Sequence, residues 1–222
     1  MQTRLEITSD GSHTLFVPAL NEHYHSTFGA VQESMTVFIQ YGFDKTDEAI
    51  FPVHILEMGF GTGLNALLTL IKSEKSSRPV HYTGVEKFPL PFGIIEQLNY
   101  PQLLDTGSME KFHSLHKAAW NQEIKITADF TLCKIENDLQ EVLLNPYTFD
   151  LVYYDAFGPE VQPELWNDQI FRKIAMVMKP CGILVTYSAK GSVRRALKNV
   201  GLEVEKLPGP PGKREVTRAI KK

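Results

Sequence analysis

One acid and three glycines stand at fixed spacing in the stretch V-H-I-L-E-M-G-F-G-T-G-L-N-A-L-L, residues 53–68. A short apolar run ends in Glu57, alternate glycines follow at Gly59, Gly61 and Gly63, and an apolar helical pattern then begins. This order is typical of a nucleotide-binding crevice, because glycines let the backbone approach a ligand and a helix N-terminus offers unpaired N–H groups. A dinucleotide fingerprint would need glycine where Leu64 stands, so a nicotinamide cofactor is disfavoured. The alternative is an ordinary glycine-rich turn.

A second acid, Glu86, ends the apolar run 80–86. An acid at the end of the second strand of such a crevice accepts hydrogen bonds from the two ribose hydroxyls, although a solvent-facing acid is the alternative. Together, Glu57, the glycines and Glu86 resemble the motifs of class I S-adenosylmethionine (SAM) methyltransferases. That resemblance implies SAM as the cofactor, with Glu57 at its methionine end, directly or through water. It also implies that an acid of the run Glu136-Asn137-Asp138, after a third strand, meets the adenine amino group, and we choose Glu136 over Asp138.

The candidate for the chemistry itself is Asp155, which follows the apolar run 149–154 and opens the loop D-A-F-G-P. This loop is similar to the (Asp/Asn)-Pro-Pro-(Tyr/Phe) loop of amino-group methyltransferases, which holds an amine beside an aromatic ring. An aliphatic amine arrives largely as ammonium, so a carboxylate suits it better than an amide. We therefore expect Asp155 to bind, orient and deprotonate the amine, with Phe157 packed beside it. Alternatively, Asp155 only caps the turn before Pro159.

The strands and helices that must position these residues alternate along the sequence, as apolar runs followed by helical patterns. They predict an α/β, Rossmann-like class I methyltransferase fold with a mainly parallel sheet that ends in an antiparallel hairpin. The expected strands cover residues 53–56, 80–86, 124–135 (a hairpin or two strands), 149–154, 183–187, 203–207 and 215–220, and the expected helices cover residues 64–71, 139–144, 165–178 and 192–199.

The N-terminal part predicts an extension packed on that core. Residues 4–17 alternate around Asp10-Gly11, which is a hairpin signal, and residues 30–39 read as a helix that buries Val31, Met35 and Phe38. We therefore divide the chain into an extension, residues 1–50, and a methyltransferase domain, residues 51–222.

Composition sets limits on compartment and partners. The chain has 222 residues, of which 43% are hydrophobic and 22% charged, as in an ordinary globular protein. No run reaches transmembrane length, and the first residues lack an apolar signal region, so no membrane partner is expected. Cys133 and Cys181 lack metal-ligand spacing and read as free thiols of a reducing cytoplasm. The H-Y-H cluster at residues 23–25 has no acid at metal-binding spacing, so no metal is expected.

Charge is spread unevenly along the chain. Residues 187–222 carry ten Lys/Arg against three acids, a net charge of +7, which leaves −10 for residues 1–186. Such a basic tail indicates a polyanion that meets one face of the molecule, although a merely solvated basic C-terminus is common.

Five stretches carry a more specific resemblance: Y-H-S-T-F-G-A-V-Q-E-S-M-T-V-F, L-E-M-G-F-G-T-G-L-N, D-A-F-G-P-E-V-Q-P-E-L-W, T-Y-S-A-K-G-S-V-R-R-A-L and G-K-R-E. In this order, over almost the whole chain, they resemble the methyltransferase half of the bifunctional MnmC-type enzymes of tRNA wobble uridine. The resemblance implies SAM-dependent methylation of 5-aminomethyl-2-thiouridine in tRNA. It also implies that tRNA phosphates are bound by basic residues within these motifs, namely Lys190, Arg194, Arg195, Lys213 and Arg214, any of which could instead form a structural ion pair.

Two departures from the family pattern matter. The bifunctional enzymes carry a second, flavin-dependent half, whereas this sequence ends at Lys222. It is then either a stand-alone methyltransferase or a trimmed piece, and a separate enzyme would supply the aminomethyl uridine. The family often has Gly-Asp after the third strand, where this chain has Ile135-Glu136, which weakens the adenine assignment.

Two other function classes compete with tRNA methylation. One is a methyltransferase of the same fold that acts on another amine, in a small molecule or a protein, which the basic tail disfavours. The other is a non-catalytic RNA-binding module, which the intact set of acids and glycines disfavours.

Overall fold

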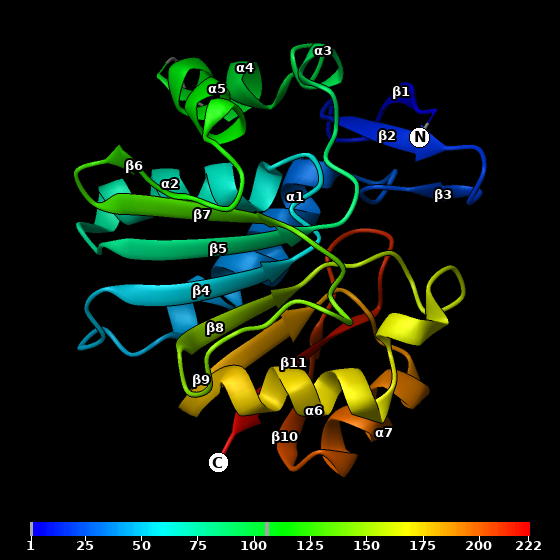
Figure 1. Cartoon of the computed structure of the whole chain (residues 1–222). Coiled ribbons are helices and arrows are strands. Elements are labelled where there is room, and N and C mark those ends of the chain that lie inside the picture. Colours follow the sequence, from blue (N-terminus) through cyan, green and yellow to red (C-terminus); the bar gives the residue numbers. More distant parts are fainter. Residues whose placement is uncertain (1, 105–106) are drawn as a thin grey trace.

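An eight-stranded sheet forms the centre of the computed structural model, which describes residues 2–104 and 107–222 (Figure 1). The strand order is β10-β11-β9-β8-β4-β5-β7-β6. The five parallel strands are β4 (Val53–Met58), β5 (Val80–Glu86), β7 (Phe130–Glu136), β8 (Phe149–Tyr154) and β9 (Met178–Thr186). The antiparallel strands are β6 (Glu123–Thr127), β10 (Leu202–Pro208) and β11 (Glu215–Lys221). The predicted sheet with its terminal antiparallel hairpin is confirmed.

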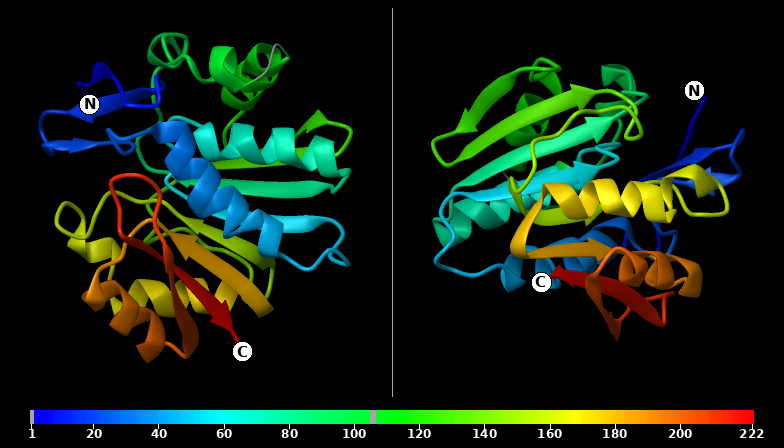
Figure 2. Two further views of the ribbon diagram at one scale, coloured as in Figure 1. Left: turned by 180° about the vertical axis from the view of Figure 1, so that it is seen from behind. Right: turned by 60° about the horizontal axis from the view of Figure 1, so that its bottom comes forward.

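The central strands are buried on both faces, which is why they read as continuous apolar runs. In β8, Leu151 and Tyr153 belong to one hydrophobic cluster, whereas Val152 and Tyr154 belong to a second one. Helices cover both faces (Figure 2). The first cluster includes side chains of α1 (Ala30–Ser34), α2 (Leu64–Ser76), α3 (Phe92–Ile95), α4 (Tyr100–Leu104) and α5 (Ser108–Lys117), and the second those of α6 (Asp168–Val177) and α7 (Gly191–Asn199). None of the described helices is both long and apolar enough to cross a membrane.

The N-terminal extension forms a small sheet of β1 (Arg4–Ile7), β2 (His13–Val17) and β3 (Glu22–His23), which confirms the predicted hairpin. After α1 the chain continues as a π-helix, Met35–Gln40, and a 3₁₀ turn, Phe43–Lys45. Phe38 is buried as predicted, but Val31 and Met35 are only partly buried. Leu15 and Phe38 share a hydrophobic cluster with Ile55 of β4, so the extension packs on the core. The division after residue 50 stays a prediction.

Two predicted helices differ in the structure. Residues 139–141 form a turn and residues 142–144 have no regular secondary structure, because Asp138 Oδ1 accepts the backbone N–H of Gln140 and offers the backbone a local alternative. The helix predicted at 165–178 is shorter. A 3₁₀ turn, Pro163–Leu165, precedes it, and Asn167 caps α6 by accepting the N–H of Ile170. Met178 already pairs with Phe149 in the sheet, so β9 begins there.

Candidate active site

A cavity of about 1080 Å³ lies at the carboxyl ends of the parallel strands, where ligands of open α/β sheets bind. The segments after β4, β5, β7, β8 and β9 line it, together with parts of the N-terminal extension and of the β10–β11 turn. Residues far apart in sequence therefore share one site, and most of the sequence-predicted residues reach it.

The glycine turn lies on this cavity, but its three glycines have different neighbours. Gly59 and Gly61 line the cavity. Gly59 has a φ of 89°, and a Cβ there would lie 2.8 Å from the carbonyl oxygen of Asp155, so only glycine lets the two loops approach. Gly63 precedes α2 with a φ of 71°, and a Cβ there would lie 2.6 Å from His116 Nε2. Gly63 is not among the residues that line the cavity, so its missing side chain makes room for His116 rather than for a ligand.

Glu86 is held with both carboxylate oxygens fixed. The backbone N–H of Gly61 donates to Oε2 at 3.0 Å, and the N–H of Phe88 donates to Oε1 at 2.8 Å. Each oxygen keeps a lone pair, and Glu86 lines the cavity. A rigid pair of acceptors at the end of the second strand suits a ribose diol.

Glu57 lies behind the cavity rather than in it. Its side chain is buried, and Asn65 Nδ2 donates to Oε1 at 2.9 Å, while Oε2 has no hydrogen-bond partner among the described residues. Burial raises the pKa of Glu57, and the bond from Asn65 acts in the opposite direction. The same Asn65 Nδ2 donates to Asp155 Oδ2 at 2.8 Å. Glu57 therefore connects to the cavity through Asn65, which the sequence reading left without a role.

Asp155 lies where the sequence placed it, at the end of β8 and on the cavity. Its backbone N–H donates to the carbonyl of Met58 at 3.0 Å, which fixes the loop against β4. Loss of water on burial raises the pKa of its carboxyl, and the nearby Glu33 carboxyl raises it further. Asn65 and Lys213 act in the opposite direction.

The loop that begins at Asp155 is held by two hydrogen bonds to aromatic side chains. Tyr187 donates its hydroxyl to the carbonyl of Ala156 at 2.9 Å, and Trp166 Nε1 donates to the carbonyl of Phe157 at 2.7 Å. The Phe157 ring packs edge-on against Tyr24, with centroids 5.0 Å apart, and both line the cavity. The expected aromatic side chain beside Asp155 is therefore present, within a larger group of rings.

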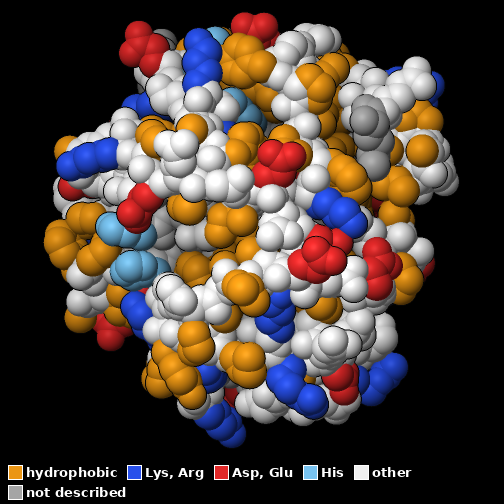
Figure 3. Space-filling model, viewed as in Figure 1, with side chains coloured by type: hydrophobic (Ala, Val, Ile, Leu, Met, Phe, Trp, Pro, Cys, Tyr) orange, Lys and Arg blue, Asp and Glu red, His pale blue; other side chains and the backbone are white. Residues whose placement is uncertain are grey.

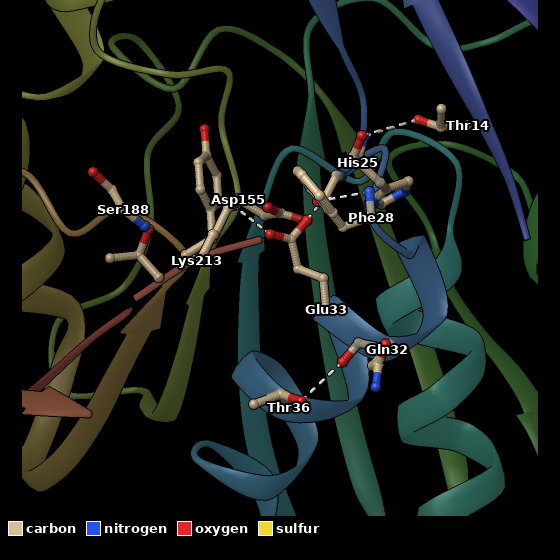
Figure 4. Close-up of polar contacts among 12 residues, drawn as sticks. Thr14, His25, Phe28, Gln32, Glu33, Thr36, Asp155, Ser188 and Lys213 are labelled. Carbon is tan, nitrogen blue, oxygen red and sulfur yellow. Dashed lines mark hydrogen bonds and ion pairs between the residues drawn. The ribbon is translucent and has the colours of Figure 1, made fainter. Parts of the chain in front are cut away.

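Glu33, Lys213 and Tyr187 complete this end of the cavity. Figure 4 shows Glu33 and Lys213 beside Asp155. The Glu33 side chain is 7% exposed and forms an ion pair with Lys213, whose Nζ lies 4.1 Å from the centroid of the Tyr187 ring. The sequence reading gave Glu33 no role, although it lies within the motif that contains Tyr24. Its neighbours on the short helix, Gln32 and Ser34, are ordinary polar residues and gave no local signal for function.

Glu136 does not reach the cavity. Glu136 is exposed, and its backbone N–H donates a hydrogen bond to Asn121 Oδ1. Asn137 and Asp138, the next residues, line the cavity instead. The chain turns into the cavity one residue after the end of β7, so the position of Glu136 does not support the predicted contact, and Asn137 and Asp138 become the candidates for it.

The five basic residues assigned to tRNA have different surroundings. Arg194 is 9% exposed, and its guanidinium binds Glu215, Thr217 and the carbonyl of Val216. It holds α7 on β11 and is not available to a phosphate, so the prediction for this residue is wrong.

The other four basic residues are more open. Lys213 faces the interior of the cavity, and Lys190 pairs with Glu160 at its edge. Arg195 and Arg214 are exposed and form no ion pair within residues 2–104 and 107–222. Figure 3 shows several Lys and Arg side chains over the region of α6 and α7.

His25 is a structural histidine of the cavity wall. Its Nε2 lies 2.7 Å from Thr62 Oγ1, and burial lowers its pKa to about 4, so the ring is neutral at physiological pH. In the described part of the chain, no three His, Cys, Asp or Glu side chains group as metal ligands would.

Comparisons with known proteins agree with this geometry. The model of a family of S-adenosyl-L-methionine-dependent methyltransferases matches residues 102–222. The chain is 29% identical to the tRNA 5-methylaminomethyl-2-thiouridine biosynthesis bifunctional protein MnmC of Cupriavidus metallidurans, over 96% of the chain and 33% of that protein. It is 32% identical to the protein of the same name from Campylobacter hominis, over 75% of the chain and 25% of that protein. The chain thus spans a third or less of these curated relatives.

Solved structures lead to the same family. The MnmC2 crystal structure from Aquifex aeolicus superposes with a TM-score of 0.83 at 27% identity, over all of this chain and 70% of that one. Spermidine synthase from Thermotoga maritima, with a TM-score of 0.54 at 11% identity, shares the fold alone. The predicted resemblance to the MnmC methyltransferase half is confirmed, and the chain belongs to this family of S-adenosyl-L-methionine-dependent methyltransferases.

Proposed function

We propose that the protein transfers a methyl group from SAM to the 5-aminomethyl group of wobble 5-aminomethyl-2-thiouridine in tRNA, which yields 5-methylaminomethyl-2-thiouridine. The names of the MnmC relatives support the substrate class. The observation that carries the proposal is the position of Asp155, because a carboxyl group there shares one cavity with the glycine turn and Glu86. An amine held by Asp155 would therefore lie beside a nucleoside cofactor.

The residues present fit SAM. Gly59 and Gly61 open the backbone on the cavity, and Glu86 presents two fixed acceptors for the ribose hydroxyls. Asn137 and Asp138, which line the cavity, would contact the adenine in place of Glu136. When bound, SAM supplies an electrophilic methyl group on a sulfonium. A volume of about 1080 Å³ leaves room for a modified base beside the cofactor.

Asp155 would bind the substrate ammonium and accept its proton. Methyl transfer needs the free amine, so a nearby base must take the proton before or during the reaction. A pKa raised by burial makes Asp155 a stronger base than a surface carboxylate. Phe157 and Tyr24 would pack beside the amine and keep water away.

The RNA would meet the exposed basic residues around the cavity. Lys190, Lys206 and Arg214 line its edge, and Arg195 is exposed on the neighbouring α7. Such residues bind phosphates without reading sequence. The substrate is itself a modified uridine, so we expect a separate enzyme to supply it. The free thiols Cys133 and Cys181 fit a protein of the reducing cytoplasm.

The direct test is incubation of the protein with methyl-labelled SAM and tRNA from cells that lack the modification, followed by digestion and nucleoside analysis. Label in 5-methylaminomethyl-2-thiouridine supports the proposal. Label in another nucleoside, or in a protein or small amine added in parallel, would assign the same fold to a different amine. If the protein binds SAM but transfers no methyl group, the non-catalytic RNA-binding module would be the remaining interpretation.

A further inference from the structure

One carboxylate oxygen of Glu33 points into the part of the cavity that the carboxyl group of Asp155 also faces. Glu33 lies on the short helix α1, and the N–H of Ser26 donates to its Oε2 at 3.0 Å. Its Oε1 meets the ammonium of Lys213. Figure 4 shows the carboxyl groups of Glu33 and Asp155 directed toward the same space. Two acids from segments 122 positions apart therefore converge on one point of the cavity.

Lys213 reaches this point from the β10–β11 turn. The turn backbone is fixed, because the N–H of Gly209 donates to the carbonyl of Arg214 and the N–H of Lys213 to that of Pro210. The Lys213 side chain is 27% exposed and ends over the Tyr187 ring. A lysine stem has four rotatable bonds, so the ammonium could leave Glu33 without any movement of the strands.

The charges at this point do not balance. Asp155 and Glu33 face a single ammonium, that of Lys213, and Asp155 forms no ion pair within the described residues. Its only side-chain partner there is the neutral amide of Asn65. The Glu33 carboxyl raises the pKa of Asp155, as expected for two acids that compete for one cation. A second cation, or a better placed one, would satisfy both acids.

We propose that Glu33 and Asp155 together form the binding seat for the primary ammonium group of the substrate, and that Lys213 occupies this seat as a resident counter-ion until the substrate displaces it. An ammonium has three N–H donors, which two carboxylates can accept from different sides. The faces of Tyr187 and its aromatic neighbours also suit a cation, and they continue to suit it after methylation. The identity of the ammonium as a wobble-uridine substituent depends on the proposed function, but the seat does not.

The competing explanation is that Glu33 and Lys213 form a structural link between α1 and the β10–β11 turn. Both explanations predict that Lys213→Ala is less stable than the wild type. They differ in whether a free cation can replace the lysine. A seat accepts a small alkylammonium, whereas a structural link needs the covalent connection to the turn.

Chemical rescue tests this difference without RNA or SAM. The melting temperature of Lys213→Ala is measured at pH 8 in ethylammonium chloride and in tetramethylammonium chloride at equal concentration. We expect ethylammonium to restore at least half of the lost melting temperature, and tetramethylammonium, which has no N–H donor, to restore much less. The double variant Glu33→Gln/Lys213→Ala should show no such difference between the salts. Lys111→Ala, which loses an ion pair with Glu74 elsewhere, serves as the matched control and should show none either.

Equal recovery of the melting temperature in both salts, or the same recovery in the double variant, would refute the proposal that Glu33 and Asp155 bind an ammonium group. A second measurement uses the methylation assay. Glu33→Gln should raise the KM for tRNA about tenfold, with a smaller change in kcat. Lys213→Met should lower KM, because the substrate no longer competes with the lysine, whereas Lys206→Met at the cavity edge should raise it. A rise in KM for Lys213→Met equal to that for Lys206→Met would show that Lys213 only binds phosphate.

The two proposals fail separately. Rescue by ethylammonium together with an absence of tRNA methylation would retain the cation seat and reject the wobble-uridine substrate. Methylation of tRNA without rescue would retain the proposed function and reject the seat.

Discussion

Replacement of Asn65 by leucine removes a group that joins two acids, the buried Glu57 and the partly buried Asp155. Asn65 is 2% exposed, and its Nδ2 donates to Glu57 at 2.9 Å and to Asp155 at 2.8 Å. Leucine has the same branched side-chain skeleton of four heavy atoms, although its methyl groups are bulkier, so it can occupy this position on α2. The loss then comes from the two acids, and above all from Glu57, whose other oxygen has no partner among the described residues.

The size of the loss should depend on pH. When both acids are protonated, two neutral hydrogen bonds are lost, at about 0.5–1.5 kcal/mol each; when both are ionised, each bond is worth about 1.5–3 kcal/mol. The free energy of unfolding should therefore fall by about 1–3 kcal/mol at low pH and by about 3–6 kcal/mol at high pH. The sign follows from the hydrogen bonds of Asn65, which lower the pKa values of Glu57 and Asp155 against the rise that burial causes, so their loss costs more when the acids are ionised. Stability supplied by their neutral forms is present at low pH and is lost as the pH rises toward the folded-state pKa values.

Urea denaturation at pH 5 and pH 8, followed by circular dichroism, measures this difference. Ser73→Ala on the same helix is the control, because it removes one neutral bond, from the Ser73 hydroxyl to the carbonyl of Arg78. We expect the control to lose a similar, small amount at both pH values. If Asn65→Leu lost the same amount at pH 5 and pH 8, the two acids would not be coupled through Asn65, and the reasoning would be refuted.

Three further predictions concern the proposed function. Glu86→Ala loses two charge-assisted acceptors, so calorimetry should show SAM affinity reduced about 10²-fold or more; unchanged affinity would exclude the ribose contact. Asp155→Asn should bind SAM but turn over about 10²-fold more slowly, with part of the loss recovered at high pH, where more of the amine is neutral; a wild-type pH–rate profile would contradict this. Charge reversal of Arg195 and Arg214 should weaken tRNA binding and flatten its salt dependence, whereas Arg194→Ala should instead lower the melting temperature; equal salt slopes for the reversed and wild-type proteins would exclude a phosphate contact.

The sequence by itself determined the sheet and the end of it at which ligands bind. Runs such as F-D-L-V-Y-Y, in which Asp150 is the one charged residue, are mainly apolar, and a parallel strand that is covered on both faces requires such a composition. Residues that follow such strands must gather at one edge, so Glu86 and Asp155 could be placed in the same cavity from their positions alone. The glycine turn was equally readable, because a backbone with positive φ restricts the residue type.

What the sequence could not determine is which side chain meets which. A one-residue difference at the end of β7 puts Asn137 and Asp138, rather than Glu136, on the cavity. The side chain of Arg194 looked as basic as that of Arg195, but the helical periodicity of α7 buries the first against β11 and exposes the second. Neighbours in sequence thus receive opposite environments from packing.

The sequence was least informative about contacts between segments that are distant from one another in the chain. Asn65 joins Glu57 to Asp155, which lies 90 positions after Asn65 in the sequence. Lys213 pairs with Glu33, which lies 180 positions before it. No local pattern encodes such a contact, because each residue type is ordinary in its own segment. Only the tertiary structure, which brings the β10–β11 turn beside α1 and the end of β8, decided that these groups share one cavity and alter one another's charge.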